Sequence, residues 1–349
     1  MSKLFTLLGA ILFHLTVIVS GVVLTDLVTI KTGSTYGGCD GSTDALDVWY
    51  KESYESLLSA LMATARYNNM DADGQRVRKA MFSYFGIRNQ FTKADKPEVK
   101  EITLRLNQIV DWLEDKFTDI PRDRTFLFCG SDFLVQKDPA TQALDYQGNG
   151  LVDTNGNPVP ISQVPAYQAD LAGGNVPWWS GERANINGYY FTSSDDGGNY
   201  CSDTEHLGLT STLKELVQGP TGPELVQQEE AQTIVICPNA FESTAPSTYS
   251  EAVMKTTEGI RLDHVVPKST TLLHEAFHVV LGTEFLQGDD EIYGLAECVN
   301  ARRDPTKAQK NPENFVYFIA AMHFLFGDPA EGITTNWDFA TAANTAKAI

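Results

Sequence analysis

One apolar segment in the last quarter of the chain carries two histidines one helical turn apart. Residues 272–281 read LLHEAFHVVL, in which His274 and His278 interrupt a hydrophobic run and Glu275 follows the first histidine. The polar residues 269–271 precede this run and suit a helix N-terminus. Because residues i and i+4 share one face of an α-helix, both imidazoles project to the same side. The sequence therefore predicts a buried helix over 269–282 that presents two imidazoles together.

This H-E-x-x-H spacing is typical of a catalytic zinc site. The imidazoles of His274 and His278 are predicted to bind one Zn²⁺ per chain, with Glu275 facing the open coordination position. A carboxylate at that place can accept the proton of a zinc-activated water, which makes Glu275 the predicted general base. The alternative interpretation is a buried helix with two hydrogen-bonded histidines and no metal.

A catalytic zinc needs a third protein ligand, and several downstream carboxylates are candidates. Glu297 is spaced as in glutamate-type zinc peptidases, but Ala301 stands four residues on, where those enzymes carry an acidic residue. Asp289 and Asp290 lie closer to the histidines. An acidic run of this kind can also be a solvated surface patch, so the residues alone leave the third ligand open.

The segment 288–294 reads GDDEIYG, and its Asp-x-x-Tyr-Gly pattern resembles the third-ligand motif of the aspzincins, the deuterolysin and peptidyl-Lys metalloendopeptidase family of secreted fungal enzymes. The resemblance implies Asp290 as third ligand and Tyr293 as a hydrogen-bond donor to the transition state. The stretch 311–318, NPENFVYF, resembles the helix that follows the active site in that family. Two alternatives remain: Asp289 as ligand with Asp290 capping a helix, and Tyr293 as a core aromatic.

The cysteine order also fits the N-terminal framework of the aspzincins. The chain has five cysteines and no C-x-x-C pair, which favours disulfides over metal ligands in an oxidising compartment. We predict the disulfides Cys39–Cys129 and Cys201–Cys237, with Cys298 left as a free, buried thiol.

The N-terminus predicts export. Residues 4–24 form an almost unbroken apolar run after Lys3, which is typical of a secretory signal peptide over 1–21. An uncleaved membrane anchor is the alternative, because the run is long enough to span a bilayer. With 45 acidic against 26 basic residues, the net charge of −19 argues against nucleic-acid partners. We expect an extracellular monomer without stable membrane association, whose substrates are proteins or peptides.

The remaining sequence predicts an α+β, zincin-like metalloprotease fold in one domain, 22–349, rich in helix with a small sheet. Helical patterns dominate about 41–120 and 268–327, and strands and long loops fill about 121–245. The predicted helices are 41–67, 72–86, 97–117, 269–282, 290–303 and 312–326, and the predicted strands are 125–129, 188–193 and 232–237. The stretch 131–187, dense in Gly, Pro, Asn and Asp, is predicted to be a long surface excursion, which the pair Trp178–Trp179 either pins or uses as a lid.

The function that these patterns favour is zinc-dependent endopeptidase activity. A non-catalytic zinc scavenger or allergen of the same fold is the main alternative, but related proteins of that kind lack the glutamate between the histidines, and Glu275 is present. A structural zinc usually has four protein ligands, and Cys298 is the only further cysteine near the motif.

Overall fold

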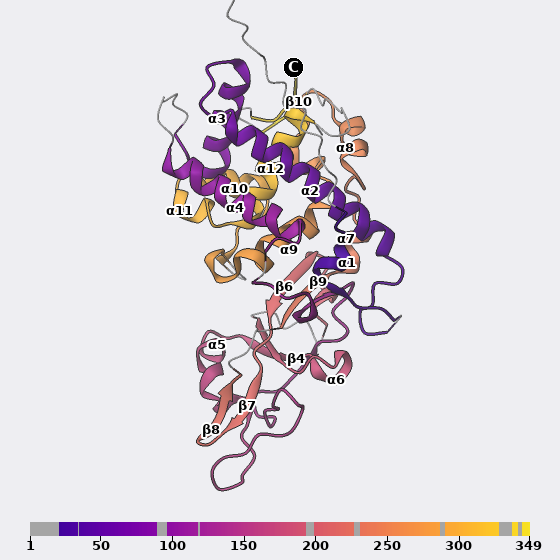
Figure 1. Ribbon diagram of the computed structural model, residues 1–349, viewed down its shortest axis with the longest axis vertical. Coiled ribbons are helices and arrows are strands. Elements are labelled where there is room, and N and C mark those ends of the chain that lie inside the picture. The colour runs from indigo at the N-terminus through magenta and orange to yellow at the C-terminus, as the bar shows by residue number, and fades with distance from the viewer. Residues whose placement is uncertain are drawn as a thin grey trace, which may run out of the picture.

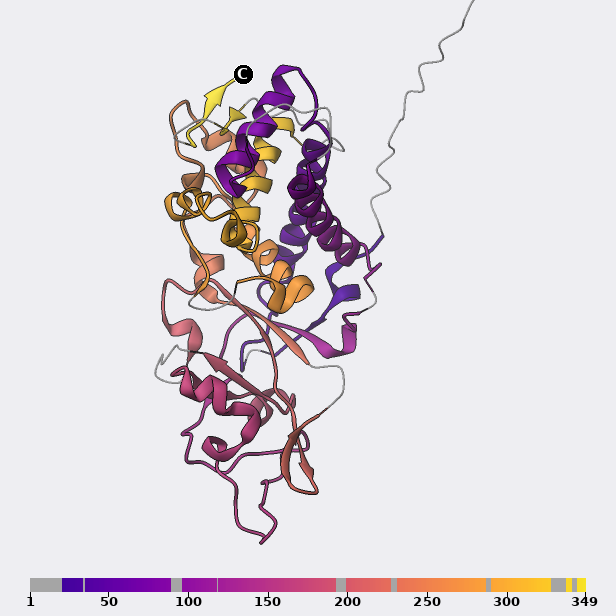
Figure 2. The same ribbon diagram turned by 90° about the vertical axis from the view of Figure 1, so that its left-hand side faces the viewer.

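The computed structural model has an α+β architecture, with a helical body at one end of a long molecule and a lobe of short strands and loops at the other (Figures 1 and 2). A small central sheet lies between them. The structure describes residues 21–33, 35–88, 96–117, 119–192, 199–226, 231–286, 290–327, 337–340 and 344–349. The predicted signal peptide, apart from Gly21, lies outside these residues.

The helical body is built on five helices that share one hydrophobic core. They are α2 (Thr43–Ala65), α3 (Ala72–Phe85), α4 (Pro97–Leu113), α9 (Thr270–Leu281) and α12 (Pro312–Phe326). Helix α12 is hydrophobic on all sides and buries every residue except Glu313 and Phe326, so it forms the centre of the bundle. Local signals set the ends: α4 and α12 begin with proline, and α3 ends at Gly86 with φ 68°.

Shorter elements complete this body. They are α1 (Leu24–Leu27), α7 (Pro238–Glu242), α8 (Tyr249–Lys255), α10 (Leu295–Ala301), α11 (Pro305–Ala308) and the two-stranded pair β10 (Trp337–Asp338) and β11 (Lys347–Ala348). The predicted helix 290–303 is therefore shorter than expected, since α10 begins only at Leu295. The residues just before α10 belong to a loop that contributes to the site described below.

The central sheet has four described strands in the order β1 (Thr29–Ile30), β2 (Thr125–Phe128), β9 (Gln232–Ile236) and β6 (Gly208–Thr212). The first three run parallel, and β6 is an antiparallel edge strand that lies beside α9. The predicted disulfides Cys39–Cys129 and Cys201–Cys237 are confirmed, and they tie flanking loops to the ends of β2 and β9. Cys298 is free and buried, as predicted.

The prediction of a surface excursion over 131–187 is wrong in one respect, because this stretch folds around a core of its own. We call residues 131–192 and 213–226 the β lobe. It contains the sheet β3 (Val135–Gln136), β4 (Val176–Trp179) and β5 (Tyr189–Thr192), the hairpin β7 (Leu216–Gly219) and β8 (Gly222–Leu225), and the short helices α5 (Gln168–Ala172) and α6 (Gly181–Ala184). Trp178 and Trp179 are both buried on β4, which fits the pinning role.

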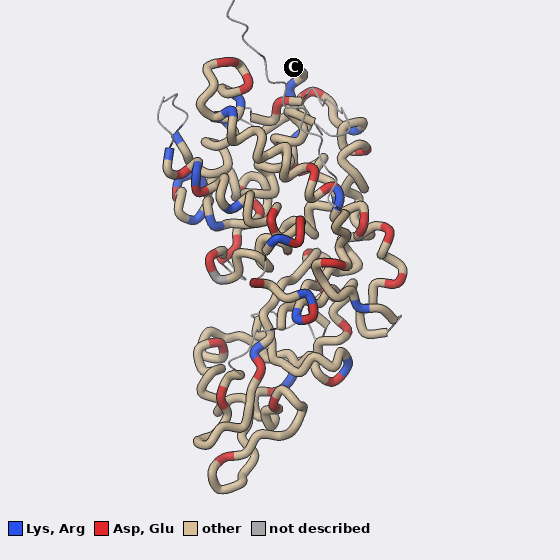
Figure 3. The backbone as a smooth tube through the Cα atoms, in the orientation of Figure 1, with Lys and Arg blue, Asp and Glu red and all other residues tan. Residues whose placement is uncertain are grey.

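In the view of Figure 3, the described Lys and Arg positions lie among Asp and Glu positions in both parts of the molecule.

Candidate metal centre

Helix α9 carries the two histidines at the end of the helical body that faces the central sheet (Figure 1). Its apolar residues pack on both the helical core and the sheet, so the helix is buried almost throughout. The helix stops at Leu281 because Gly282 takes φ 47°, a left-handed value that favours glycine. A rigid, buried helix is a suitable support for ligands that must keep a fixed geometry.

The predicted pair of imidazoles is confirmed, and a carboxylate joins them. His274 and His278 are 8% and 9% exposed, and their rings lie 5.2 Å apart. The Nε2 atoms of His274 and His278 lie 3.7 Å and 2.6 Å from the same oxygen, Oε1 of Glu291. The three candidate ligand atoms lie within 4.8 Å of one another, which is a group that can hold a metal ion.

The carboxylate in this group is Glu291 and not the neighbouring Asp290. The side chain of Glu291 is only 5% exposed, whereas Asp290 is exposed and lies outside the group. Glu297, the other candidate from the sequence, is exposed in the first turn of α10 and also lies outside it. Asp289 falls outside the described residues. Residues 291–293 are not helical, so successive side chains in this loop do not follow the helical spacing assumed from the sequence.

The chemistry of these three residues fits a divalent cation. Oε1 of Glu291 is buried and makes no hydrogen bond of ordinary geometry, although two imidazole nitrogens face it. Two close imidazole nitrogens and a buried carboxylate oxygen are groups that one bound cation would satisfy together. Two imidazoles and one carboxylate form the ligand set of many catalytic zinc sites.

A second carboxylate orients the first histidine. Nδ1 of His274 lies 3.0 Å from Oε2 of Glu313, at the start of α12. This contact leaves Nε2 facing Glu291, as in the carboxylate–histidine pairs that support metal sites. Burial opposes protonation of His274, but Glu291 and Glu313 outweigh it and raise the pKa of His274 well above its usual value. Burial acts against ionisation of Glu291 too, yet the two histidines hold the pKa of its carboxyl well below the ordinary range.

The predicted general base is held against the edge strand. Glu275 is 4% exposed, and its Oε2 accepts a hydrogen bond of 2.8 Å from Oγ1 of Thr210 on β6. Its other oxygen lies over Gly208, where an added Cβ would come within 2.3 Å of Oε1. Burial raises the pKa of Glu275, and the two histidines oppose this rise. A raised carboxyl pKa suits a group that accepts and returns a proton near neutral pH.

Tyr293 lies at the rim of the site. Its ring stacks 5.9 Å from that of His274, its hydroxyl donates to Oε2 of Glu291, and the residue is 57% exposed. Burial of the hydroxyl and the charge of Glu291 raise the pKa of Tyr293, so the phenol stays protonated and able to donate. The structure thus brings Tyr293 to the site, although its predicted part in stabilising a transition state remains a prediction.

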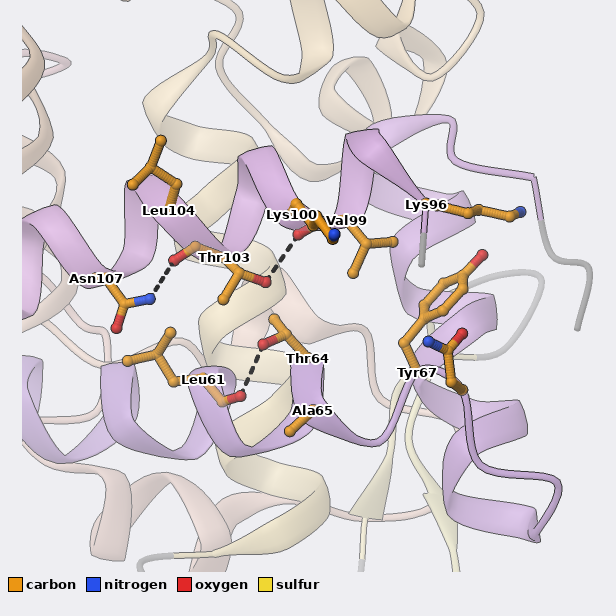
Figure 4. A pocket seen from close by; sticks show the side chains of 11 residues that line it. Leu61, Thr64, Ala65, Tyr67, Lys96, Val99, Lys100, Thr103, Leu104 and Asn107 are labelled. Atoms are coloured by element: carbon orange, nitrogen blue, oxygen red, sulfur yellow. Dashed lines mark hydrogen bonds between the residues drawn. The ribbon is translucent and has the colours of Figure 1, made fainter. Parts of the chain in front are cut away.

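A groove of about 620 Å³ between α2 and α4 is separate from this site (Figure 4). Its walls are mainly aliphatic and amide side chains, and Thr64, Thr103 and Asn107 donate to backbone carbonyls of their own helices. None of the residues predicted to act in catalysis lines it.

No model of a known protein family matches the chain, and no curated protein matches it. Within the described residues, no helix has both the length and the apolar character that crossing a membrane requires. The two disulfides are consistent with an oxidising compartment.

Proposed function

We propose that this chain is a secreted, zinc-dependent endopeptidase with His274, His278 and Glu291 as the zinc ligands and Glu275 as the general base. The observation that carries the proposal is the convergence of both Nε2 atoms on Oε1 of Glu291, with a buried glutamate next to the first histidine. Secretion is supported by the apolar N-terminal run and by the disulfides.

Zinc, when bound, supplies a Lewis acid that lowers the pKa of a coordinated water and polarises a carbonyl group. The residues of the chain supply the proton transfers. Glu275 accepts the proton of the attacking water and returns it to the leaving amine, which its raised pKa favours. Thr210 holds one oxygen of this carboxylate, and the other lies over Gly208. Tyr293 has a protonated hydroxyl at the rim; its one hydrogen now points to Oε2 of Glu291 and would turn from that oxygen to a developing oxyanion.

The edge strand supports a peptide as the substrate. In the described sheet, β6 pairs with β9 on one side only, and it lies directly beside α9. An extended peptide can add to such an edge through main-chain hydrogen bonds, and Gly208 and Thr210 would then hold it next to Glu275. Binding through the main chain does not require a chain end, so it favours cleavage within a polypeptide.

Incubation of the purified chain with casein tests this proposal. We expect hydrolysis that a chelator abolishes and that a stoichiometric amount of zinc restores. The matched control is Glu284→Gln, an exposed glutamate just beyond α9, which should behave as the wild type. A chain that binds one zinc ion yet cleaves neither casein nor a peptide library would contradict the endopeptidase assignment and favour a zinc-binding protein without catalysis.

A further inference from the structure

The loop that carries Glu291 is held from α12 by a single side chain. Asn311, directly before α12, accepts a hydrogen bond of 2.9 Å from the backbone N–H of Ile292 and donates one of 2.8 Å to the carbonyl of the same residue. Ile292 lies between Glu291 and Tyr293, so one amide group fixes the peptide units that orient both side chains.

Asn311 is itself held in place by the helical body. Its Nδ2 also donates to Oδ1 of Asn314 at 2.8 Å, and both asparagines are buried. The amide of Asn314 donates in turn to the carbonyls of Tyr84 at 2.6 Å and Cys298 at 2.9 Å. The network therefore ties the loop to α3, α10 and α12 at once.

Both donors of the Asn311 amide have acceptors, and its oxygen has a donor. A buried amide that loses its partners is unfavourable. A different loop conformation would leave these groups unpaired inside the protein. The loop is consequently fixed by contacts that do not involve a metal ion.

The start of α12 supports the metal centre on two sides. Asn311 fixes the loop of Glu291, and Glu313, two residues further on, contacts Nδ1 of His274. The remaining proposed ligand, His278, belongs to the same helix as His274. One helix N-terminus thus orients two of the three proposed ligands, each through a different side chain.

From this geometry we propose that Asn311 is a positioning residue of the metal centre, which pre-forms the Glu291 loop so that its carboxylate meets the imidazoles before metal binds. The inference rests on the proposed zinc site but not on peptidase activity. Outer residues that orient ligands typically change metal affinity by about 10- to 100-fold when they are replaced.

The test measures zinc affinity and folding stability separately. Affinity is obtained by competition with a chromophoric chelator, and stability by urea unfolding of the chelator-treated protein. For Asn311→Ala we expect both a lower urea midpoint and zinc binding weaker by about tenfold or more. The control is Ser180→Ala in the β lobe, a buried hydroxyl that donates to the carbonyls of Ile186 and Gly188. That variant should lose stability and keep its zinc affinity.

A second measurement uses the wild-type protein, so its result does not depend on whether Asn311→Ala folds. Because the backbone N–H of Ile292 donates to Asn311, we expect it to exchange with deuterium slowly in the metal-free protein. The rate should be at least about tenfold lower than in an unstructured peptide. Free exchange of that amide, or wild-type zinc affinity in Asn311→Ala, would overturn the positioning role. Zinc binding without peptidase activity in the wild type would instead refute the proposed enzyme and leave this inference standing.

Discussion

The helical body and the β lobe are stabilised by different kinds of contact. In the helical body, long helices bury continuous apolar faces against α12 and form one large core. The β lobe has short strands and smaller hydrophobic clusters, in which Tyr189 contacts the rings of Tyr167 and Trp179. The proposed ligands all come from the helical body, whereas β6, at the boundary, supplies contacts to Glu275.

In the β lobe, two aspartates stabilise turns in segments that have little regular secondary structure. Asp145 accepts the backbone N–H groups of the residues two and four positions on, and Asp153 does the same one repeat later. Each turn contains a glycine at positive φ, Gly148 at 85° and Gly156 at 81°. The lobe therefore depends on local polar turns where the helical body depends on long apolar stripes, and its disturbance should stay local.

The largest effect should follow from removing the proton acceptor in the helical body. Glu275→Gln keeps the shape of the side chain and its contact with Thr210, but it cannot take up a proton. We expect zinc content to be unchanged and kcat/KM to fall by about a thousandfold or more. Peptidase activity within tenfold of the wild type would show that another group acts as the base.

The buried histidine of α12 should make the stability of the helical body depend on pH. Burial lowers the pKa of His323 from 6.5 to about 4, so the unfolded chain binds a proton at a higher pH than the folded one. This contribution to stability is present above pH 6.5 and is lost as the pH falls from 6.5 to 4, by about 3 kcal/mol in total. His323→Gln should flatten the loss measured by urea unfolding across that range, and an equal loss in both proteins would contradict a neutral buried imidazole.

Adding a methyl group to Gly208, at the boundary between the two regions, should lower the catalytic rate and leave metal binding unchanged. In Gly208→Ala, the Cβ would come within 2.3 Å of Oε1 of Glu275 and displace the carboxylate. A displacement of this size typically costs about 100-fold in rate. Gly41→Ala is the control, because no atom lies within 4 Å of its Cβ position. Full activity of Gly208→Ala, measured at equal zinc content, would mean that Glu275 does not need this position.

The smallest effect should come from the β lobe. Asp145→Ala removes the acceptor of two turn N–H groups and should destabilise the lobe by about 1–2 kcal/mol. Hydrogen exchange should increase over 141–160, while zinc affinity stays at the wild-type value. If zinc affinity and the stability of the β lobe fall together, the two regions are coupled. The β lobe and the helical body would then not be stabilised independently.

The histidine pair and most helices were predictable from the sequence because they depend on local spacing. An apolar run with imidazoles at i and i+4 fixes their common face wherever the helix packs. The bounds of α2, α3, α4 and α12 follow from proline, glycine and apolar periodicity in the same way. The disulfide pairing was obtained through the resemblance to the aspzincins.

The third group of the centre could not be settled from the sequence, because it depends on contacts between distant segments. Asp290 and Glu291 are adjacent acids, and the loop conformation that separates them is fixed by Asn311. A helix over 290–303 was predicted from composition, but Asn311 binds both backbone groups of Ile292, so the helix begins later. Thr210 lies 65 residues before the carboxylate that it binds. None of the predicted strands covered 208–212, so the contact of Thr210 with Glu275 was not foreseen.

Zinc content in a matched pair of variants tests the central claim most directly. Glu291→Gln and Asp290→Asn each neutralise one of two adjacent acids, so the net charge is the same in both variants. Atomic absorption after dialysis against buffered zinc gives metal per chain. The structure predicts about one zinc per chain in the wild type and in Asp290→Asn, with a loss of affinity of more than about tenfold in Glu291→Gln. Retention of zinc by Glu291→Gln and its loss from Asp290→Asn would contradict the centre described here and restore the assignment that the aspzincin resemblance implies.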